Sequence, residues 1–446
     1  MRQVVILVCA VSLLFACSSD DSVVTNNDFF KVYVLGNSTQ VDVFDFQEVE
    51  DVGFVIYSRV FQGNRTIEPK ALFLLTDQIG NIIADTIHPT LFVDTEELNA
   101  GGILFYSEKL VRSGTDYFFI DQSGFTTSNA SAHIIKMTIS PTNETAFQMS
   151  DHYMISDQGV PALGERGFDL LAGSTLGELY LSGVDQNGTY YLGKIGSGNL
   201  IWNVEASTIS DWDPNRTPPY TDVIPYLSLA SYNGSEAIFI RRIGGEPIFG
   251  SSGSGYNIKG FFTADGSAIL DTIAPHEPIS IVGAFPVNTN FPTAVYENGG
   301  ALHVASMTIN DALNENLLPK ITYGIVDNGG STMAIPDSLD RHEFSTRELV
   351  RDYPVSITKV SKGGVDALIY MGTTNNGQIL LLSFNQATGD LLNRRLLGFD
   401  SFYIGKRFLQ TSDGGFAVLG EVVTAGRFKQ ICLFKFSPSE LDFLLQ

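Results

Sequence analysis

A short unit recurs seven times along the chain: a turn that ends in glycine, an apolar run directly after it, and a second strand-turn-strand segment further on. The glycines that mark the units are Gly53, Gly102, Gly167, Gly234, Gly300, Gly364 and Gly415. Successive glycines are 49 to 67 residues apart, a period typical of repeat proteins, and four strands per unit are typical of propeller blades. The repeat therefore predicts an all-β chain that forms a single β-propeller of seven four-stranded blades.

The last unit shows the expected order of strands within a blade. Residues 406–410 form a first strand, a tight turn follows at 411–415, and residues 416–423 form a second strand. A loop leads to a third strand at 430–436, and we expect residues 441–446 to form the fourth. Aspartate and two glycines suit the turn because Asp tolerates left-handed dihedral angles and Gly adopts a positive φ without steric cost.

Hairpins with polar turns predict the third and fourth strands of the other units, at residues 71–87, 116–125, 189–204, 256–273, 320–335 and 377–397. Residues 80–89 and 266–275 match at six of ten positions and lie 186 residues apart, which equals three units of 62. An additional strand at 29–35 has no place in this count, so we expect it to pair with a free edge beside the seam of the ring. A ring of six or eight blades is the alternative blade count, and a pair of irregular β-sandwiches is the alternative fold.

The N-terminus has the features of a secretory signal peptide. Arg2 supplies a positive start, and residues 4–15 form a 12-residue apolar run, shorter than the roughly 20 residues that a bilayer requires. Residues 14–17 resemble a bacterial lipobox, which implies that Cys17 becomes lipidated and N-terminal after cleavage. The alternative is an ordinary cleaved signal that leaves Cys17 as a thiol.

We therefore predict three parts: a signal peptide at 1–16, a lipidated and flexible acidic tether at 17–28, and the propeller at 29–446. Residues 18–21 resemble the surface-export signal of Bacteroidota lipoproteins, and residues 411–420 resemble propeller segments common in secreted proteins of that phylum. The resemblances imply a protein anchored by lipid in the outer membrane and displayed at the cell surface. Such lipoproteins often work beside outer-membrane transport or secretion proteins.

Charge and cysteine content exclude some partners and bonds. The chain has 27 Lys and Arg against 49 Asp and Glu, a formal net charge of -22. A phosphate backbone requires clustered Lys and Arg, so nucleic acid is not an expected partner. Of the three cysteines, Cys9 leaves with the signal and Cys17 carries lipid, which leaves Cys432 alone as a small buried side chain of a strand.

The two faces of a propeller receive different connections. We call the face with the strand 1–2 and 3–4 turns the turn face, and the face with the strand 2–3 and blade-to-blade connections the loop face. The expected long insertions all fall on the loop face, at residues 126–150, 204–222, 241–255, 275–285, 306–319 and 335–352. Long and varied loops on a rigid scaffold commonly carry binding sites, so we expect the functional site there.

One loop on that face, residues 208–222, holds a group of aromatic and charged side chains that could bind a ligand. These predicted ligand-binding residues are Trp212, Tyr220, Asp211, Asp213 and Arg216. An exposed Trp beside acids and an Arg can stack on a sugar ring or anchor a peptide or an envelope-protein partner. The alternative is that Trp212 packs into the blade junction. The loop begins like a calcium loop, but Arg216 stands where Gly is required, so no metal site is predicted.

Signatures of catalysis are absent from the sequence. No second His follows His342-Glu343 at the zinc-protease spacing, and neither a GxSxG elbow nor a complete sialidase box occurs. We therefore predict no catalytic residues and no cofactor, and a binding or interaction module for a glycan, a peptide or an envelope protein. A glycoside hydrolase or lyase is the alternative, because a pair of loop carboxylates either about 5 Å or about 6.5 to 9.5 Å apart would suffice. A structural subunit of an envelope machine is a third candidate.

Overall fold

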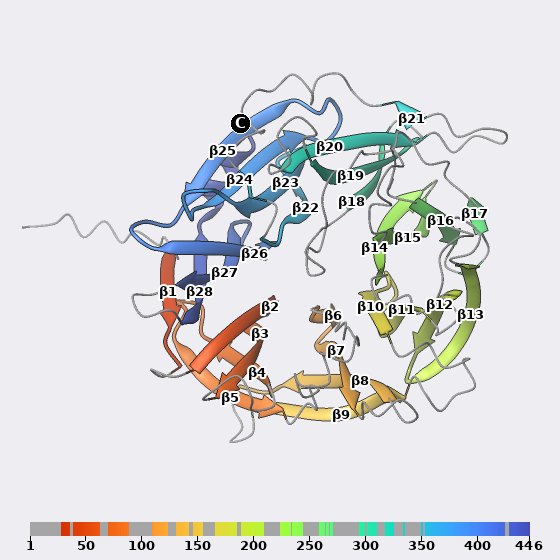
Figure 1. Ribbon diagram of the computed structural model, residues 1–446, viewed down its shortest axis with the longest axis horizontal. Helices are drawn as coiled ribbons and strands as arrows, with labels where there is room; N and C mark the ends of the chain where they lie inside the picture. Colours follow the sequence, from red (N-terminus) through yellow and green to blue (C-terminus); the bar gives the residue numbers. More distant parts are fainter. Residues whose placement is uncertain are drawn as a thin grey trace, which may run out of the picture.

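The computed structural model describes residues 28–35, 39–62, 70–88, 109–123, 131–141, 146–154, 166–184, 189–208, 224–232, 234–243, 258–263, 265–266, 268–270, 294–298, 301–309, 317–324, 333–334, 349–350, 353–423 and 428–446. The strands within them form seven four-stranded antiparallel sheets arranged around a central axis (Figure 1). This arrangement confirms the prediction of an all-β propeller. No helix among these residues is long and apolar enough to cross a membrane.

The first four sheets follow one another along the chain and are called blades 1 to 4. Blade 1 contains β2 (Thr39–Val49), β3 (Gly53–Gln62), β4 (Lys70–Thr76) and β5 (Ile82–His88). Blade 2 contains β6 (Val111–Ser113), β7 (Asp116–Ser123), β8 (Ser131–Ile139) and β9 (Phe147–Met154). Blade 3 contains β10 (Arg166–Ala172), β11 (Glu178–Val184), β12 (Thr189–Gly196) and β13 (Asn199–Thr208). Blade 4 contains β14 (Ile224–Tyr232), β15 (Ser235–Ile243), β16 (Ile258–Thr263) and β17 (Ala268–Leu270).

The remaining three sheets complete the ring, and the last of them joins the two ends of the chain. Blade 5 contains β18 (Ala294–Asn298), β19 (Ala301–Ile309), β20 (Leu317–Gly324) and β21 (Met333–Ala334). Blade 6 contains β22 (Ser356–Lys362), β23 (Val365–Thr373), β24 (Ile379–Asn385) and β25 (Leu391–Leu397). Blade 7 contains β26 (Phe402–Gln410), β27 (Phe416–Val423), β28 (Lys429–Phe436) and the N-terminal strand β1 (Phe29–Tyr33). A helix, α4 (Pro438–Leu444), follows β28.

β1 closes the ring as the outermost strand of blade 7. It pairs antiparallel with β28, with Phe29 opposite Lys435 and Tyr33 opposite Ile431. The expectation that this segment pairs with an edge at the seam is confirmed. The predicted fourth strand at 441–446 is wrong, because β1 occupies the edge of β28 and residues 441–444 belong to α4 instead.

The helix has a sequence signal that a strand assignment overlooks. Leu441, Leu444 and Leu445 stand at i, i+3 and i+4, which places them on one face of a helix. All three are buried in the core between blades 6 and 7. Pro438 lies in the first turn of the helix, a position that suits proline because no N–H is required there.

Three predictions around blades 2 and 3 were wrong: Gly167 as the marker of a turn, the hairpin at 116–125 and the insertion at 126–150. Gly102 lies outside the described residues, and Gly167 lies inside the first strand β10 rather than before a second strand. Gly114 and Gly177 occupy the corresponding turns, with φ of 66° and 78°. As a result, the hairpin predicted at 116–125 begins with the second strand β7, and the insertion predicted at 126–150 contains β8 and the start of β9.

The core lies between neighbouring blades, because each sheet buries both of its faces. In β23, Leu368 and Tyr370 pack toward blade 5, whereas Ile369 and Met371 pack toward blade 7. This period of two is the strand geometry that places successive side chains on opposite faces. Because both faces are buried, the strands have nearly continuous apolar sequences.

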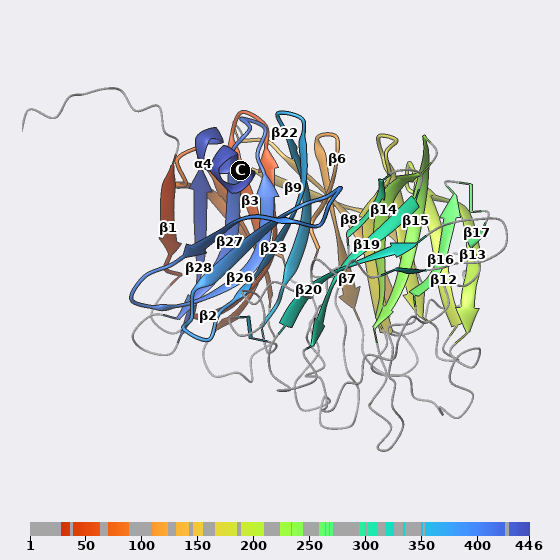
Figure 2. The ribbon, with the colours of Figure 1, turned by 90° about the horizontal axis from the view of Figure 1, so that it is seen from above.

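The connections differ between the two faces as predicted. Among the strands described, connections on the turn face are short, as between Val49 and Gly53 or Gln410 and Phe416. Connections on the loop face extend to the 23 residues between Leu270 and Ala294. Figure 2 shows the strands running between the two faces, with α4 at the turn face.

Candidate functional site

The site residues predicted from the sequence lie outside the described residues. Residues 209–223 include Asp211, Trp212, Asp213, Arg216 and Tyr220, and Cys17 precedes the first described residue, Asp28. β13 ends at Thr208 and β14 begins at Ile224, so the segment between them starts and finishes on the loop face. The ligand-binding and lipidation predictions therefore stay predictions.

Side-chain oxygens on one blade accept hydrogen bonds from backbone N–H groups at the first strand of the next blade. The four acceptor and donor pairs in the described residues are Asp45–Leu110, Asp169–Leu227, Thr373–Gly405 and Glu421–Val43. Their O···N distances lie between 2.7 and 3.1 Å. Because buried backbone groups require partners, these bonds fix the blades against one another.

Asp45 and Asp169 occupy equivalent places on blades 1 and 3. Each follows a register shift in its first strand, a β-bulge that re-aims the carboxylate out of its own sheet. Burial raises the pKa of Asp45, against the opposing effects of Arg407 and of two backbone N–H groups. Asp169 has a closer cation, with Lys109 Nζ at 2.6 Å from Oδ2.

A second charged group, the seam cluster, joins blades 7 and 1 and consists of Asp42, Arg59, Lys406, Glu421 and Lys429. Glu421 is completely buried and lies 2.9 Å from Lys406 Nζ and 3.0 Å from Lys429 Nζ. Asp42 lies 2.8 Å from Arg59 and 3.6 Å from Lys429. Burial acts to raise the pKa of Asp42, but Arg59 and Lys429 outweigh it and hold that pKa below its usual value.

The seam cluster has a structural role. Asp42 and Glu421 both contact Lys429, so the cluster brings two carboxylates together, and two carboxylates are what a glycosidase uses. A general acid, however, must reach the substrate and hold a proton near neutral pH. Glu421 has no exposed surface and Asp42 has a lowered pKa, so neither fits that role. The described residues also contain no group of three His, Cys, Asp or Glu side chains arranged to hold a metal.

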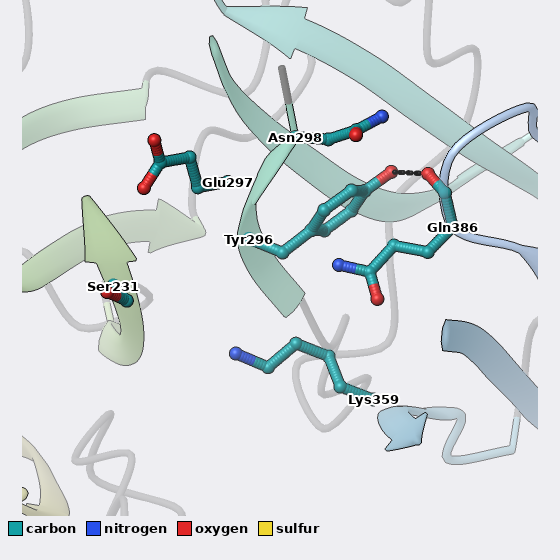
Figure 3. A pocket seen from close by; sticks show the side chains of 6 residues that line it. All are labelled: Ser231, Tyr296, Glu297, Asn298, Lys359 and Gln386. Atoms are coloured by element: carbon teal, nitrogen blue, oxygen red, sulfur yellow. Dashed lines mark hydrogen bonds between the residues drawn. The ribbon is translucent and has the colours of Figure 1, made fainter. Parts of the chain in front are cut away.

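An open pocket of about 500 Å³ lies on the turn face where blades 4, 5 and 6 meet (Figure 3). Its lining residues are Ser231, Tyr296, Glu297, Asn298, Lys359 and Gln386. They come from the first strands β14, β18 and β22 and from the turn between β24 and β25. Sequence reasoning did not find this pocket, because it combines three blades and lies opposite the face that loop length favours.

Lys359 and Tyr296 hold the pocket together. Lys359 Nζ donates to the carbonyl oxygens of Leu229 at 3.1 Å and Val295 at 3.0 Å, so one side chain of blade 6 joins blades 4 and 5. The partial removal of this ammonium group from water lowers the pKa of Lys359. The Tyr296 hydroxyl donates to the Gln386 carbonyl oxygen at 3.1 Å, and its ring stacks on His303 with centroids 5.0 Å apart.

No family model and no curated protein matches the chain. Among solved structures, the polysaccharide lyase Uly1 aligns over 94% of this chain and 91% of its own, with 12% identity and a TM-score of 0.46. Trypanosoma rangeli sialidase in complex with sialic acid aligns over 93% of this chain and 60% of its own, with 12% identity and a TM-score of 0.42. The β-propeller domain of the trilobed protease from Pyrococcus furiosus aligns over 89% and 95%, with 9% identity and a TM-score of 0.42. At these identities and scores the likeness assigns no activity to this chain.

Proposed function

We propose that the protein is a non-catalytic binding module of the cell envelope, anchored by a lipid on Cys17, that presents its loop face away from the anchoring membrane. The direction of β1 carries this proposal. β1 begins at the turn face, where the carboxylate of Asp28 accepts the backbone N–H of Ser437 at the start of α4. An anchor on the preceding residues therefore joins the ring at the turn face.

The length of the tether limits the distance between the lipid and the turn face. Eleven peptide steps separate Cys17 from Asp28, so the lipid lies within roughly 40 Å of the turn face even at full extension. The loop face, which carries the longer connections, points the other way. A display protein whose binding loops face outward requires this arrangement of anchor and loops.

The roles of the buried acids favour binding over catalysis. Asp45, Asp169 and Glu421 each accept a hydrogen bond from a backbone N–H of the neighbouring blade, and a cation lies beside each of them. Acids that hold the fold together in this way are unavailable for proton transfer to a substrate. The hydrolase alternative would have to draw its carboxylates from other parts of the chain.

The lipid anchor is tested by the variant Cys17→Ser. We expect the wild-type protein to partition into a detergent phase and the variant to partition into the aqueous phase, with the same melting temperature for both. The melting temperature should not change because Cys17 precedes the first described residue of the fold. A variant that still partitions into detergent would contradict the proposed anchor.

The binding role is tested by affinity isolation from detergent-solubilised outer membranes. We expect envelope proteins or glycans to co-purify with the wild type and to be lost with Trp212→Ala and Tyr220→Ala. Phe399→Ala is the matched control, because Phe399 is a 78% exposed aromatic residue in another loop-face connection. Recovery of the same partners with all three variants would contradict a binding role for residues 208–222.

A further inference from the structure

The pocket on the turn face has opposite charges on its two sides. Figure 3 shows the Lys359 ammonium group and the Gln386 amide pointing toward the space beside the Tyr296 ring, with the Glu297 carboxylate on another side. One cation and one anion leave the lining without net charge. A ligand with a strong net charge would meet attraction on one side and repulsion on the other.

The remaining lining groups are hydrogen-bonding groups that both donate and accept. Gln386 and Asn298 carry amides, and Ser231 carries a hydroxyl. Asn298 Nδ2 donates to the Ala387 carbonyl oxygen at 3.4 Å, which positions this side chain at the junction of blades 5 and 6. Such a lining suits a ligand whose own groups donate and accept at neighbouring positions, as the hydroxyls of a sugar do.

The lining of the pocket exposes more polar than apolar surface. Its one aromatic side chain, Tyr296, is 3% exposed and has one ring face covered by His303. A peptide bound here would find no apolar recess for a side chain, although peptides usually gain affinity from such recesses. The volume of about 500 Å³ lies within the range of small-ligand sites and accommodates a short oligosaccharide.

We propose that the pocket formed by Ser231, Tyr296, Glu297, Asn298, Lys359 and Gln386 is a second binding site that takes a short, uncharged oligosaccharide. The site lies on the face opposite the loops of the proposed display function. It depends on neither the lipid anchor nor residues 208–222, so the two proposals succeed or fail separately.

The experiment is a titration of the purified full-length protein, followed by calorimetry and by saturation-transfer NMR. The probes are cellotriose, xylotriose, mannotriose, maltotriose and chitotriose, together with trigalacturonic acid and a capped Ala-Gly-Ser-Ala peptide. We expect at least one uncharged trisaccharide to bind, and the acidic saccharide and the peptide not to bind.

Variants of two lining residues test whether the trisaccharide binds in the pocket. Glu297→Gln and Gln386→Leu should each weaken the binding of that trisaccharide about tenfold, because a lost hydrogen bond to a charged or amide group is worth roughly 1.4 kcal/mol or more. Glu50→Gln is the matched control: it is the same substitution on the same face, at the turn between β2 and β3, and it should leave binding unchanged.

Gln386 is a suitable position for this test because its backbone makes the hydrogen bonds that join it to Tyr296 and Asp366. Its carbonyl accepts from Tyr296 and its N–H donates to the Asp366 carbonyl, so Gln386→Leu retains both bonds. The proposal is overturned if no uncharged trisaccharide binds, if the peptide or the acidic saccharide binds instead, or if both pocket variants bind as tightly as the wild type.

Discussion

The carboxylate of Glu421 accepts the backbone N–H of Val43 at 2.9 Å and thereby joins the last and first blades across 378 residues. The same carboxylate contacts Lys406 and Lys429. This group and the pairing of β1 with β28 close the ring by two independent means, one electrostatic and one by backbone hydrogen bonds. A closed ring keeps the two faces of the propeller in fixed positions, on which the proposed display of the loop face depends.

Glu421→Ala should strongly destabilise the protein. The substitution removes the buried carboxylate that pairs with the partly buried ammonium groups of Lys406 and Lys429 and that accepts from the Val43 N–H. Removal of one partner of a buried ion pair costs about 3 to 5 kcal/mol. Glu421→Gln retains an acceptor for Val43 and should cost less. Urea unfolding gives both free energies of unfolding, with Glu50→Gln as an exposed control. Equal losses for the Ala and Gln variants would show that the Val43 bond contributes little.

Asp169→Asn should cost more stability than Asp45→Asn. Lys109 lies 2.6 Å from Asp169, whereas Arg407 lies 3.5 Å from Asp45. Burial also raises the pKa of Asp45, so its ionised form is already disfavoured in the folded protein. We expect a loss of about 3 kcal/mol for Asp169→Asn and roughly half of that for Asp45→Asn, measured by urea unfolding. The reverse order would contradict the proposed difference between the two blade junctions.

The thiol of Cys432 should report opening of the seam. Cys432 is completely buried opposite Val32 of β1, and burial raises the pKa of its thiol, so it reacts with a thiol reagent only when the seam opens. In a Cys17→Ser background, Tyr33→Phe should speed labelling about fivefold, because it removes a buried hydrogen bond to Gly80 worth about 1 kcal/mol.

Tyr153→Phe is the control for that labelling experiment. The hydroxyl of Tyr153 is buried and has no hydrogen-bond partner among the described residues, so its removal should leave the labelling rate unchanged. If Tyr33→Phe and Tyr153→Phe label at the same rate as the wild type, the bond from Tyr33 to Gly80 does not hold β1 in place.

Asp413 should contribute a pH-dependent part of the stability. Burial acts to raise the pKa of Asp413, but Lys435, the Thr411 hydroxyl and the Gly415 N–H outweigh it and lower that pKa. A lowered pKa in the folded state stabilises the fold above the unfolded-state pKa of about 3.9, and this stabilisation is lost as pH falls through the folded-state value.

The free energy of unfolding should therefore differ most between the wild type and Asp413→Asn near pH 6, and least near pH 2. Asp366→Asn, at an exposed aspartate that follows a strand 1–2 turn, is the control. A difference that stays constant over this range would mean that Asp413 stabilises its turn without regard to its charge.

The sequence predicted the blades where their turns are rich in glycine, and it failed where the first strand is short. Gly363 and Gly364 both have positive φ in the turn between β22 and β23, and such turns were placed correctly. In blade 2 the first strand β6 has three residues, too few for a recognisable apolar run, so the sequence pattern indicates Gly102 as the marker, whereas the turn lies at Gly114. At the C-terminus, a short apolar segment fits either a strand or a helix, and the pairing of β1 with β28 decided between them.

The candidate sites were only partly within reach of the sequence. Asp45 and Asp169 each follow a phenylalanine inside an apolar strand and lie 124 residues apart, twice the unit of 62, so this repeat could have been found. The pocket gave no such signal. Tyr296 and Gln386 are 90 residues apart and meet only because blades 5 and 6 are neighbours in the ring.

The display of the loop face is tested most directly by two cysteine variants at opposite ends of one strand. Asn376 precedes β24 on the loop face, Ala387 follows it on the turn face, and both are exposed. Intact cells that carry Asn376→Cys or Ala387→Cys are treated with a bulky membrane-impermeant maleimide. We predict faster labelling of Asn376→Cys on cells and equal labelling of the two detergent-solubilised proteins. Faster labelling of Ala387→Cys on cells, or labelling of neither variant until the cells are broken, would contradict the proposal.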